Sequence, residues 1–288
     1  MQTSESTFVQ LTSMPAGRPG FEAFHGKDSN LYRWEYHCHD HYELYFHVSG
    51  GQKFGLDNDV YAMNRNEFIL LPPFCMHGLA CEGPMRSYER AYLNLTPELL
   101  NTLSCNQIDL EAFFRSYTGS GKHIFQMSDE ESSVCVSIIS SLQAMPETID
   151  SLARYQACAG IIRILSIVCS VMSRTESVTA TAVTNNVMQS VLTYINNNYT
   201  QPIRMDDVSH RFGISVSYLS HEFTKYTGRS VYDYVLYRRV MLAKEMIPSA
   251  QSLNAIAYQC GFNDYSNFLR SFNKLVGMSP REYRERHK

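Results

Sequence analysis

The chain has 288 residues, of which 44% are hydrophobic and 18% charged, a composition that argues against a disordered chain or a membrane protein. Its net charge of −3 is uneven: residues 187–288 hold 13 Lys and Arg against 8 Asp and Glu, and the remainder hold 12 against 20. The basic part favours a nucleic acid as partner and the acidic part does not. Eight cysteines without a CxxC pair indicate reduced thiols, and no signal peptide is evident, so we expect a cytoplasmic protein.

Residues 1–20 contain two prolines and two glycines and predict a flexible arm. Residues 21–127 predict a β domain, because the runs ELYFHV, KFGL, EFILL and SYERAYLNL are bounded by GG, DND and PP turn signals. Short strands at this spacing are typical of a sandwich or a small barrel.

The string His37-Cys38-His39-Asp40-His41-Tyr42-Glu43 is the most reactive-looking part of this domain. Strand alternation places His37 and His39 on one face, with Glu43 further along and His77 arriving from a later strand. These four residues resemble the HxHxxxE and PxxxH motifs of a cupin barrel, which implies a divalent metal site for Zn, Mn, Fe or Ni. A second interpretation is a small-molecule pocket with or without a metal, and a third is that the histidines are structural or face a partner.

Aromatic and polar neighbours extend the predicted effector pocket and would suit a sugar or another polar ring. The expected effector-binding residues are His37, His39, Glu43, Tyr45, His47, His77, Arg90 and Tyr92, and Trp34 and Tyr36 lie nearby in the sequence.

Two helices are predicted after the β domain, over Ser128–Met145 and Ser151–Arg174, with Pro146 between them. The second is apolar over more than one face, so we expect it to pack on the β domain and across a homodimer, or else within one chain only. Its most apolar part, residues 157–172, contains Arg163 and is interpreted as too short to span a bilayer. Residues 175–186 lack an apolar period and predict an interdomain linker.

Residues 187–288 contain an internal repeat, in which Val208–Ser230 matches Ile256–Ser279 with Gly213 aligned to Gly261. Each copy has the pattern of a helix-turn-helix. The segment Val231–Met246 between them predicts a connecting helix of about 24 Å. Two recognition helices could then lie about 34 Å apart and read two boxes of double-stranded DNA one helical turn apart.

Within each copy, periodicity separates a buried face from an outer one. Leu219 with Phe223 and Phe268 with Phe272 are expected to be buried, and the helix caps are expected at Ser215 or Ser217 and at Asp264. The predicted DNA-binding residues are Ser217, Ser220, His221, Thr224, Lys225, Tyr265, Ser266, Asn267, Arg270 and Lys274. Arg270 is the main candidate for a base contact, because Arg paired to guanine is the commonest specific one.

The second copy, GFNDYSNFLRSFNKLVGMSPREYR, resembles the signature of AraC/XylS-family transcription regulators, and the match extends over about residues 191–284. It departs from the family pattern at Val208-Ser209, where Leu-Ala is usual. The resemblance implies a cupin-like effector domain, a homodimer, and activation rather than repression.

The fold class expected is α+β with two domains: a cupin-like β-barrel with a helical dimerisation pair (residues 128–174), then an all-α double helix-turn-helix domain. The function expected is a DNA-binding regulator responding to a small molecule, with RNA polymerase as a further candidate partner and no catalytic residues. The alternatives are a regulator responding to a protein partner and a metal-dependent cupin enzyme fused to a DNA-binding domain.

Overall fold

The computed structural model describes residues 20–28, 37–50, 52–56, 59–80, 87–104, 108–119, 121–146, 150–174, 187–227 and 229–286. The predicted arm (residues 1–19), the predicted linker (175–186), Trp34 and Tyr36 lie outside the described residues.

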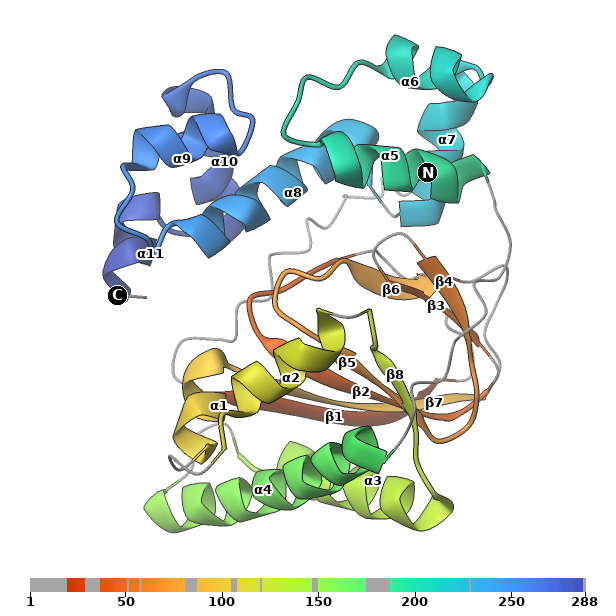
Figure 1. The fold of residues 1–288 in the computed structure, drawn as a ribbon, viewed down its shortest axis with the longest axis vertical. Helices are drawn as coiled ribbons and strands as arrows, with labels where there is room; N and C mark the ends of the chain where they lie inside the picture. Colours follow the sequence, from red (N-terminus) through yellow and green to blue (C-terminus); the bar gives the residue numbers. More distant parts are fainter. Residues whose placement is uncertain are drawn as a thin grey trace, which may run out of the picture.

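The N-terminal domain contains two antiparallel sheets (Figure 1). The five-stranded sheet has the order β1-β7-β2-β5-β8, with bounds β1 Phe21–Asp28, β7 Tyr88–Leu95, β2 Tyr42–Ser49, β5 Glu67–Leu71 and β8 Ile124–Gln126. The three-stranded sheet has the order β4-β3-β6, with bounds β4 Asp59–Met63, β3 Gln52–Leu56 and β6 His77–Ala80. The predicted runs in β2, β3, β5 and β7 are confirmed as strands.

The five-stranded sheet is apolar on both faces because it is the middle layer of the domain. One face carries Leu44, Phe46 and Leu93 and packs on the helices. The other carries Tyr45 and Ile69 and packs against the three-stranded sheet. In Figure 1 the helices α3 (Asp129–Gln143) and α4 (Ser151–Arg174) lie below this sheet, and β3, β4 and β6 lie above it.

The expected barrel is not closed in the described residues, where the two sheets remain separate ladders. The chain passes from one sheet to the other after β2 at Gly50, whose φ of 90° suits glycine. A Cβ there would lie 2.9 Å from the carbonyl oxygen of Ser87, so the backbone turns the corner against a neighbouring segment. Outside the ladders an isolated bridge joins His37 to His77. The arrangement is the sandwich that the strand spacing allowed.

Four helices accompany this domain, with bounds α1 Pro97–Leu103, α2 Leu110–Thr118, α3 Asp129–Gln143 and α4 Ser151–Arg174. The predicted helix pair is confirmed as α3 and α4. Helix α3 begins with a capping box between Ser128 and Glu131, and Glu131 also pairs with Arg174 at 2.6 Å, which joins the start of α3 to the end of α4. The elements β1, β4, β6, β8, α1 and α2 were not individually predicted. For β4, β6, β8 and α1 the reason is length, since such brief segments carry little periodic signal.

Helix α4 corrects one expectation about length. It extends over 24 residues, so by length and composition it could cross a bilayer, and residues 157–172 are only its most apolar part. The same test is passed by core helices of globular proteins, and Ile161, Ile164 and Val168 are buried against the rest of the domain.

The C-terminal domain contains seven helices in the described residues, with bounds α5 Val187–Asn198, α6 Met205–Phe212, α7 Val216–Thr227, α8 Val231–Met246, α9 Leu253–Gln259, α10 Tyr265–Val276 and α11 Pro280–Arg286. Helices α6–α7 and α9–α10 are the two predicted helix-turn-helix units, and α8 has the predicted bounds. In Figure 1, α8 runs between the two units.

Each unit is fastened by an arginine of the helix that follows it. Arg239 of α8 donates to the carbonyl oxygens of Tyr199 and Gln201, in the loop before α6. Arg284 of α11 donates to the carbonyl oxygens of Ile247 and Gln251, in the loop before α9. The two copies of the sequence repeat therefore share the same contact, from an arginine of the following helix to carbonyl oxygens before the unit.

Candidate functional site

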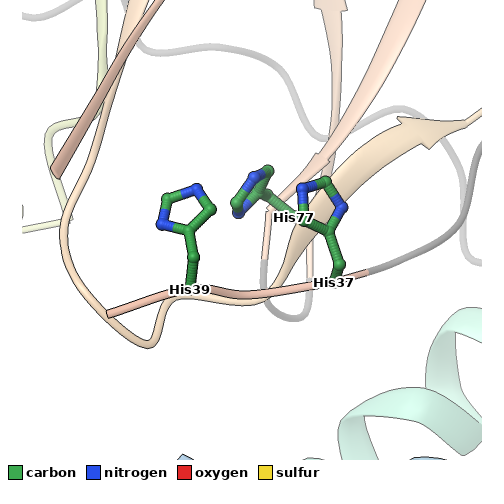
Figure 2. A group of neighbouring side chains, drawn as sticks. All are labelled: His37, His39 and His77. Atoms are coloured by element: carbon green, nitrogen blue, oxygen red, sulfur yellow. The ribbon is translucent and has the colours of Figure 1, made fainter. Parts of the chain in front are cut away.

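Three of the predicted metal-ligating histidines meet at the end of the N-terminal domain that faces the C-terminal domain. The possible ligand nitrogens of His37, His39 and His77 all lie within 4.8 Å of one another, and Figure 2 shows the three rings around a common space. His39 and His77 are buried, whereas His37 is half-buried. The fourth candidate, Glu43, places Oε2 at 2.8 Å from His39 Nε2 and 3.4 Å from His77 Nε2.

Backbone carbonyls orient two of these rings. His39 Nδ1 lies 2.9 Å from the carbonyl oxygen of His41, and His77 Nδ1 lies 3.0 Å from that of Cys75. Since a carbonyl oxygen only accepts, both Nδ1 atoms must carry the proton. In each neutral ring the lone pair is then on Nε2, which faces Glu43.

Burial makes the charges of the cluster unequal. Burial lowers the pKa of His39 to about 4, and the neighbouring His41 and His77 act in the same direction against the opposing effect of Glu43. Burial alone would raise the pKa of Glu43, but the two histidines hold it well below its usual range. Near neutral pH Glu43 is therefore a carboxylate, and the pKa of His39 favours an uncharged ring beside it.

The remaining predicted effector residues do not join this cluster. Tyr45 is in the core between the sheets, where its hydroxyl contacts that of Tyr88. His47 is four residues after Glu43 along β2, about 13 Å away at the rise of a strand. Arg90 is beside His47 in the sheet register, and it pairs with Asp28 and covers the rings of Phe24 and Tyr88.

Tyr92 is the last of these residues. It stacks on Phe24 with ring centroids 5.1 Å apart and packs against the core between the sheets. The predicted pocket residues thus divide into a histidine cluster at one end of β2 and an aromatic and charged group toward the other end.

Stability should fall in mild acid because of His47. Burial lowers the pKa of His47 from 6.5 to about 4, so between these values the unfolded chain binds a proton that the folded chain does not. The free energy of unfolding should decrease by up to about 3 kcal/mol as the pH falls from 6.5 to 4. Urea titrations at several pH values measure this, and the decline should be shallower in His47→Gln, with the part due to His39 remaining. An equal slope in both proteins would contradict it.

The cluster adjoins a contact between the two domains that the sequence did not reveal. Asp40, between His39 and His41, pairs with Lys244 of α8 at 2.7 Å, and the Lys244 side chain is 0% exposed. The Cys38 amide donates to the hydroxyl of Tyr237, also on α8, at 3.0 Å, and that hydroxyl donates to the Cys38 carbonyl oxygen. We call Cys38, Asp40, Tyr237 and Lys244 the interdomain latch.

The latch carboxylate is held ionised. Burial alone would raise the pKa of Asp40, but the His41 ring at 3.5 Å and the ammonium of Lys244 bring it well below its usual range. The hydroxyl of Tyr283, on α11, lies 3.5 Å from the same carboxylate. No local periodicity could have indicated these pairs, because about 200 residues separate the partners.

A cleft of about 950 Å³ opens beside the latch. It is bordered by both domains, and its charged lining includes Asp40, Glu98, Glu111, Arg115 and Lys244. Small solutes can therefore approach the latch from solvent.

The first recognition helix, α7, has the predicted buried pair, with Leu219 and Phe223 both at 0% exposure. Ser215 caps it by accepting a hydrogen bond from the Tyr218 amide at 3.1 Å, and Ser215 was the first of the two predicted caps. The predicted DNA-binding residues Ser217, Ser220, His221 and Lys225 are exposed, and Thr224 is half-buried.

Three of these side chains on α7 have partners within the helix. The Thr224 hydroxyl donates to the Ser220 carbonyl oxygen at 2.8 Å. Lys225 lies 3.7 Å from the carboxylate of Glu222, which also contacts His221 at 3.0 Å. An anion thus lies among the candidate DNA contacts of α7.

The second recognition helix, α10, is capped by Asp264, which accepts from the Asn267 amide at 2.6 Å, and it buries Phe268 and Phe272 as predicted. Its predicted contact residues Ser266, Arg270 and Lys274 are exposed, and Tyr265 and Asn267 are half-buried. Tyr265 packs beside Phe268 with ring centroids 5.7 Å apart.

Comparison with known proteins gives the same two-part division. A family model described as an AraC-like ligand binding domain matches residues 18–145, and one described as a helix-turn-helix domain matches residues 208–286. The HTH-type transcriptional regulator YdiP of Escherichia coli is 26% identical over 99% of this chain and 90% of its own length. The HTH-type transcriptional activator RhaS of Pectobacterium carotovorum is 26% identical over 34% of this chain and 35% of its own length.

Solved structures include a Listeria innocua protein that is 31% identical over 36% of this chain and 100% of its own, with a TM-score of 0.35. ToxT of Vibrio cholerae is 15% identical over 92% of this chain and 98% of its own, with a TM-score of 0.38. The assignment therefore rests on the two family models and the sequence relatives. The chain belongs to the AraC/XylS family of transcription regulators, with a ligand-binding N-terminal domain and a DNA-binding helix-turn-helix domain.

Proposed function

We propose that the protein reads two DNA boxes about one helical turn apart with α7 and α10, and that an effector in the N-terminal domain controls this binding. The observation that carries the proposal is the duplicated helix-turn-helix joined by the single helix α8. Because α8 has 16 residues and thus spans about 24 Å, it suits recognition helices in successive major grooves.

Sequencing genomic fragments bound by the purified full-length protein tests this proposal. The expected result is a motif of two boxes whose centres are about one helical turn apart. A single box would overturn it, as would no enrichment at low salt by either the full-length protein or residues 187–288 alone.

Arg270→Ala is expected to weaken specific DNA binding by about 5- to 150-fold and to relax base preference in one box only. The exposed guanidinium on α10 has the fork that pairs with guanine, and such a contact contributes about 1–3 kcal/mol. Fluorescence anisotropy with the selected duplex and with single-base variants measures the effect. The matched control is Arg281→Ala, an exposed arginine of α11 that pairs with Glu285 and is expected to change affinity little. Equal losses on all sequences would identify Arg270 as a phosphate contact instead.

The effector is proposed to bind at the histidine end of β2, at His37, His39, Glu43 and His77. Support comes from their convergence and from the latch on the same segment. Tyr45, His47, Arg90 and Tyr92 would then shape the interior behind that site rather than touch the effector first.

Homodimerisation through α4 is the second part of the proposal. Leu152, Tyr155 and Ile162 are 66%, 74% and 47% exposed and recur at helical spacing, which leaves an apolar stripe facing away from the core. A second copy of the same stripe would cover it around a twofold axis.

Tyr155→Glu combined with Ile162→Glu is therefore expected to convert a dimer into a monomer of 33.0 kDa. The introduced carboxylates would have to be desolvated in the interface. Sedimentation velocity at micromolar concentration measures the change, and Gln156→Glu, exposed beside the stripe, is the matched control. A wild-type chain that sediments as a monomer would contradict the dimer.

Activation through RNA polymerase and a cytoplasmic location complete the proposal, and both are supported by the relatives, which are named as transcription regulators and activators. A regulator responding to a protein partner is the second candidate. It is favoured by the close packing of Tyr45, Phe54 and Tyr88 between the sheets, which occupies space that a large ligand would need.

A further inference from the structure

We infer that His37, His39, Glu43 and His77 form a binding site for a divalent transition-metal ion of the Zn²⁺ class, and that the ion loosens the interdomain latch. The inference rests on the proposed function, since it names the effector and the route from its site to the DNA-reading domain.

The first argument is that the ring nitrogens of His39 and His77 converge on one carboxylate oxygen of Glu43. The carbonyl oxygens of His41 and Cys75 hold the protons of His39 and His77 on Nδ1. Both Nε2 lone pairs then face Glu43 Oε2, at 2.8 and 3.4 Å. With Nδ1 already donating, the His39–Glu43 contact is a hydrogen bond only when the ring carries a second proton, and a cation among these groups can take the place of that proton.

A metal ion satisfies this arrangement better than a proton. A proton on His39 Nε2 would allow a hydrogen bond from His39 to Glu43 only. It would not satisfy His77 Nε2, which is buried and makes no hydrogen bond within the described part of the chain. A metal ion takes both lone pairs and the carboxylate at once. Rings whose Nδ1–H is fixed by a carbonyl, with Nε2 directed inward, are the usual form of histidine ligands.

The donor set also defines the class of ion. Three imidazoles with one carboxylate suit Zn²⁺ and its neighbours rather than Mg²⁺ or Ca²⁺, which prefer oxygen ligands. Tetrahedral Zn²⁺ with bonds of about 2.1 Å needs donor atoms about 3.4 Å apart, whereas those of the three histidines spread up to 4.8 Å. Ion binding must therefore draw the rings inward, and the half-buried His37 is the entry side.

The second argument is that ligands and latch residues alternate along one short segment. His37 and His39 direct their rings to the common space, whereas Cys38 and Asp40 make the contacts with α8. An inward pull on the two rings draws the segment away from Tyr237 and Lys244. The positive charge of the ion also opposes the ammonium of Lys244.

Helix α8 makes this movement consequential for DNA binding. It carries two of the latch residues and connects the two helix-turn-helix units, so a latched α8 ties both recognition helices to the N-terminal domain. Release of α8 would let the pair adopt the geometry of successive major grooves. The ion acts through its preference for the unlatched arrangement.

Metal binding is tested on the full-length protein with Zn²⁺ and with Co²⁺ as a spectroscopic probe. One Zn²⁺ per chain is expected after dialysis, and Co²⁺ should give the visible absorption of a nitrogen and oxygen site. His39→Gln and His77→Gln should each weaken binding by at least about 100-fold, more than is usual for residues beyond the ligands. The control is His25→Gln, which removes a histidine of the same domain that bonds to Ser140 and Glu89.

The Zn²⁺ and Co²⁺ measurements on the wild-type protein test the site even if a variant fails to fold. Less than half an equivalent of Zn²⁺ bound at micromolar concentration, with no Co²⁺ spectrum, would overturn the site. An equal loss of binding in His25→Gln would overturn the assignment of its ligands.

The coupling is tested by amide hydrogen exchange with and without Zn²⁺. Exchange of the Cys38 amide and of α8 around Tyr237 should become faster with Zn²⁺ in the wild type and stay unchanged in His39→Gln. Tyr237→Phe removes the hydroxyl of the latch without altering charge, so by linkage it should raise the affinity for Zn²⁺ about fivefold or more. Slower exchange with Zn²⁺, or an unchanged affinity in Tyr237→Phe, would overturn the coupling.

Failure of this inference is distinguishable from failure of the proposed function. If the protein selects two DNA boxes but binds no Zn²⁺, the metal site alone is refuted. Protein that binds one Zn²⁺ but selects no DNA refutes the proposed DNA reading and leaves the site in place.

Discussion

Asp40→Asn is expected to undock the DNA-binding domain from the N-terminal domain. Lys244 is fully buried and its ammonium is neutralised by Asp40 at 2.7 Å, so the substitution leaves a buried charge without its partner. Removing one member of a buried pair costs about 3–5 kcal/mol, and separation of the domains avoids this cost by returning Lys244 to water. Hydrogen exchange of α8 and small-angle scattering measure the separation.

Two variants act as controls for this result. Asp40→Asn combined with Lys244→Met removes both charges and should recover most of the docking, because a buried pair can be replaced by apolar contact at little cost. Glu245→Gln changes an exposed charge on the next residue of α8 and should have no effect. Docking unaffected in Asp40→Asn would mean that the pair contributes nothing to the interface.

Gly261→Ala is expected to lower the free energy of unfolding of the C-terminal domain by about 3 kcal/mol or more. Gly261 has φ of 88°, and a Cβ on it would lie 2.4 Å from the carbonyl oxygen of Thr200. Both the left-handed backbone and the contact with a rigid backbone atom oppose a side chain. Thr200 belongs to the loop before the first helix-turn-helix, so the clash falls where the two units pack together. Thermal unfolding and DNA affinity should decline together.

The repeat provides a matched control at the equivalent glycine. Gly213 has φ of 65°, but a Cβ on it would meet nothing within 4 Å. Gly213→Ala should therefore cost only about 1 kcal/mol, from the backbone conformation alone. Equal losses at the two glycines would show that packing against Thr200 is unimportant.

Features that repeat at local spacing could be predicted from the sequence. The two turns at Gly213 and Gly261, the buried pair Phe268 and Phe272, and the bounds of α8 follow from periodicity and turn chemistry within about 20 residues. The positions of β2 and β7 followed for the same reason, since alternating side chains and turn residues act over a few residues.

The histidine site could be predicted only in part. Alternation placed His37 and His39 on one side, and the resemblance to the cupin motifs added Glu43 and His77 to the candidates. The approach of His77 depends on β6 packing beside the segment. The carbonyl groups that orient the rings lie two residues from each histidine, in irregular backbone that periodicity does not describe. His47 and Arg90, which were predicted to line the same pocket, do not lie at the cluster. Residues on one face of a strand lie further apart with each step along it.

The domain contact was beyond the reach of the sequence. Asp40 with Lys244 and Cys38 with Tyr237 join residues about 200 positions apart, and such pairs form only after both domains have folded. The chain therefore encodes the reading units, the buried faces and the ligand types through short-range patterns. The convergence of ligands and their connection to α8 come from long-range packing, because side chains distant along the chain meet only where sheets and helices bring them together.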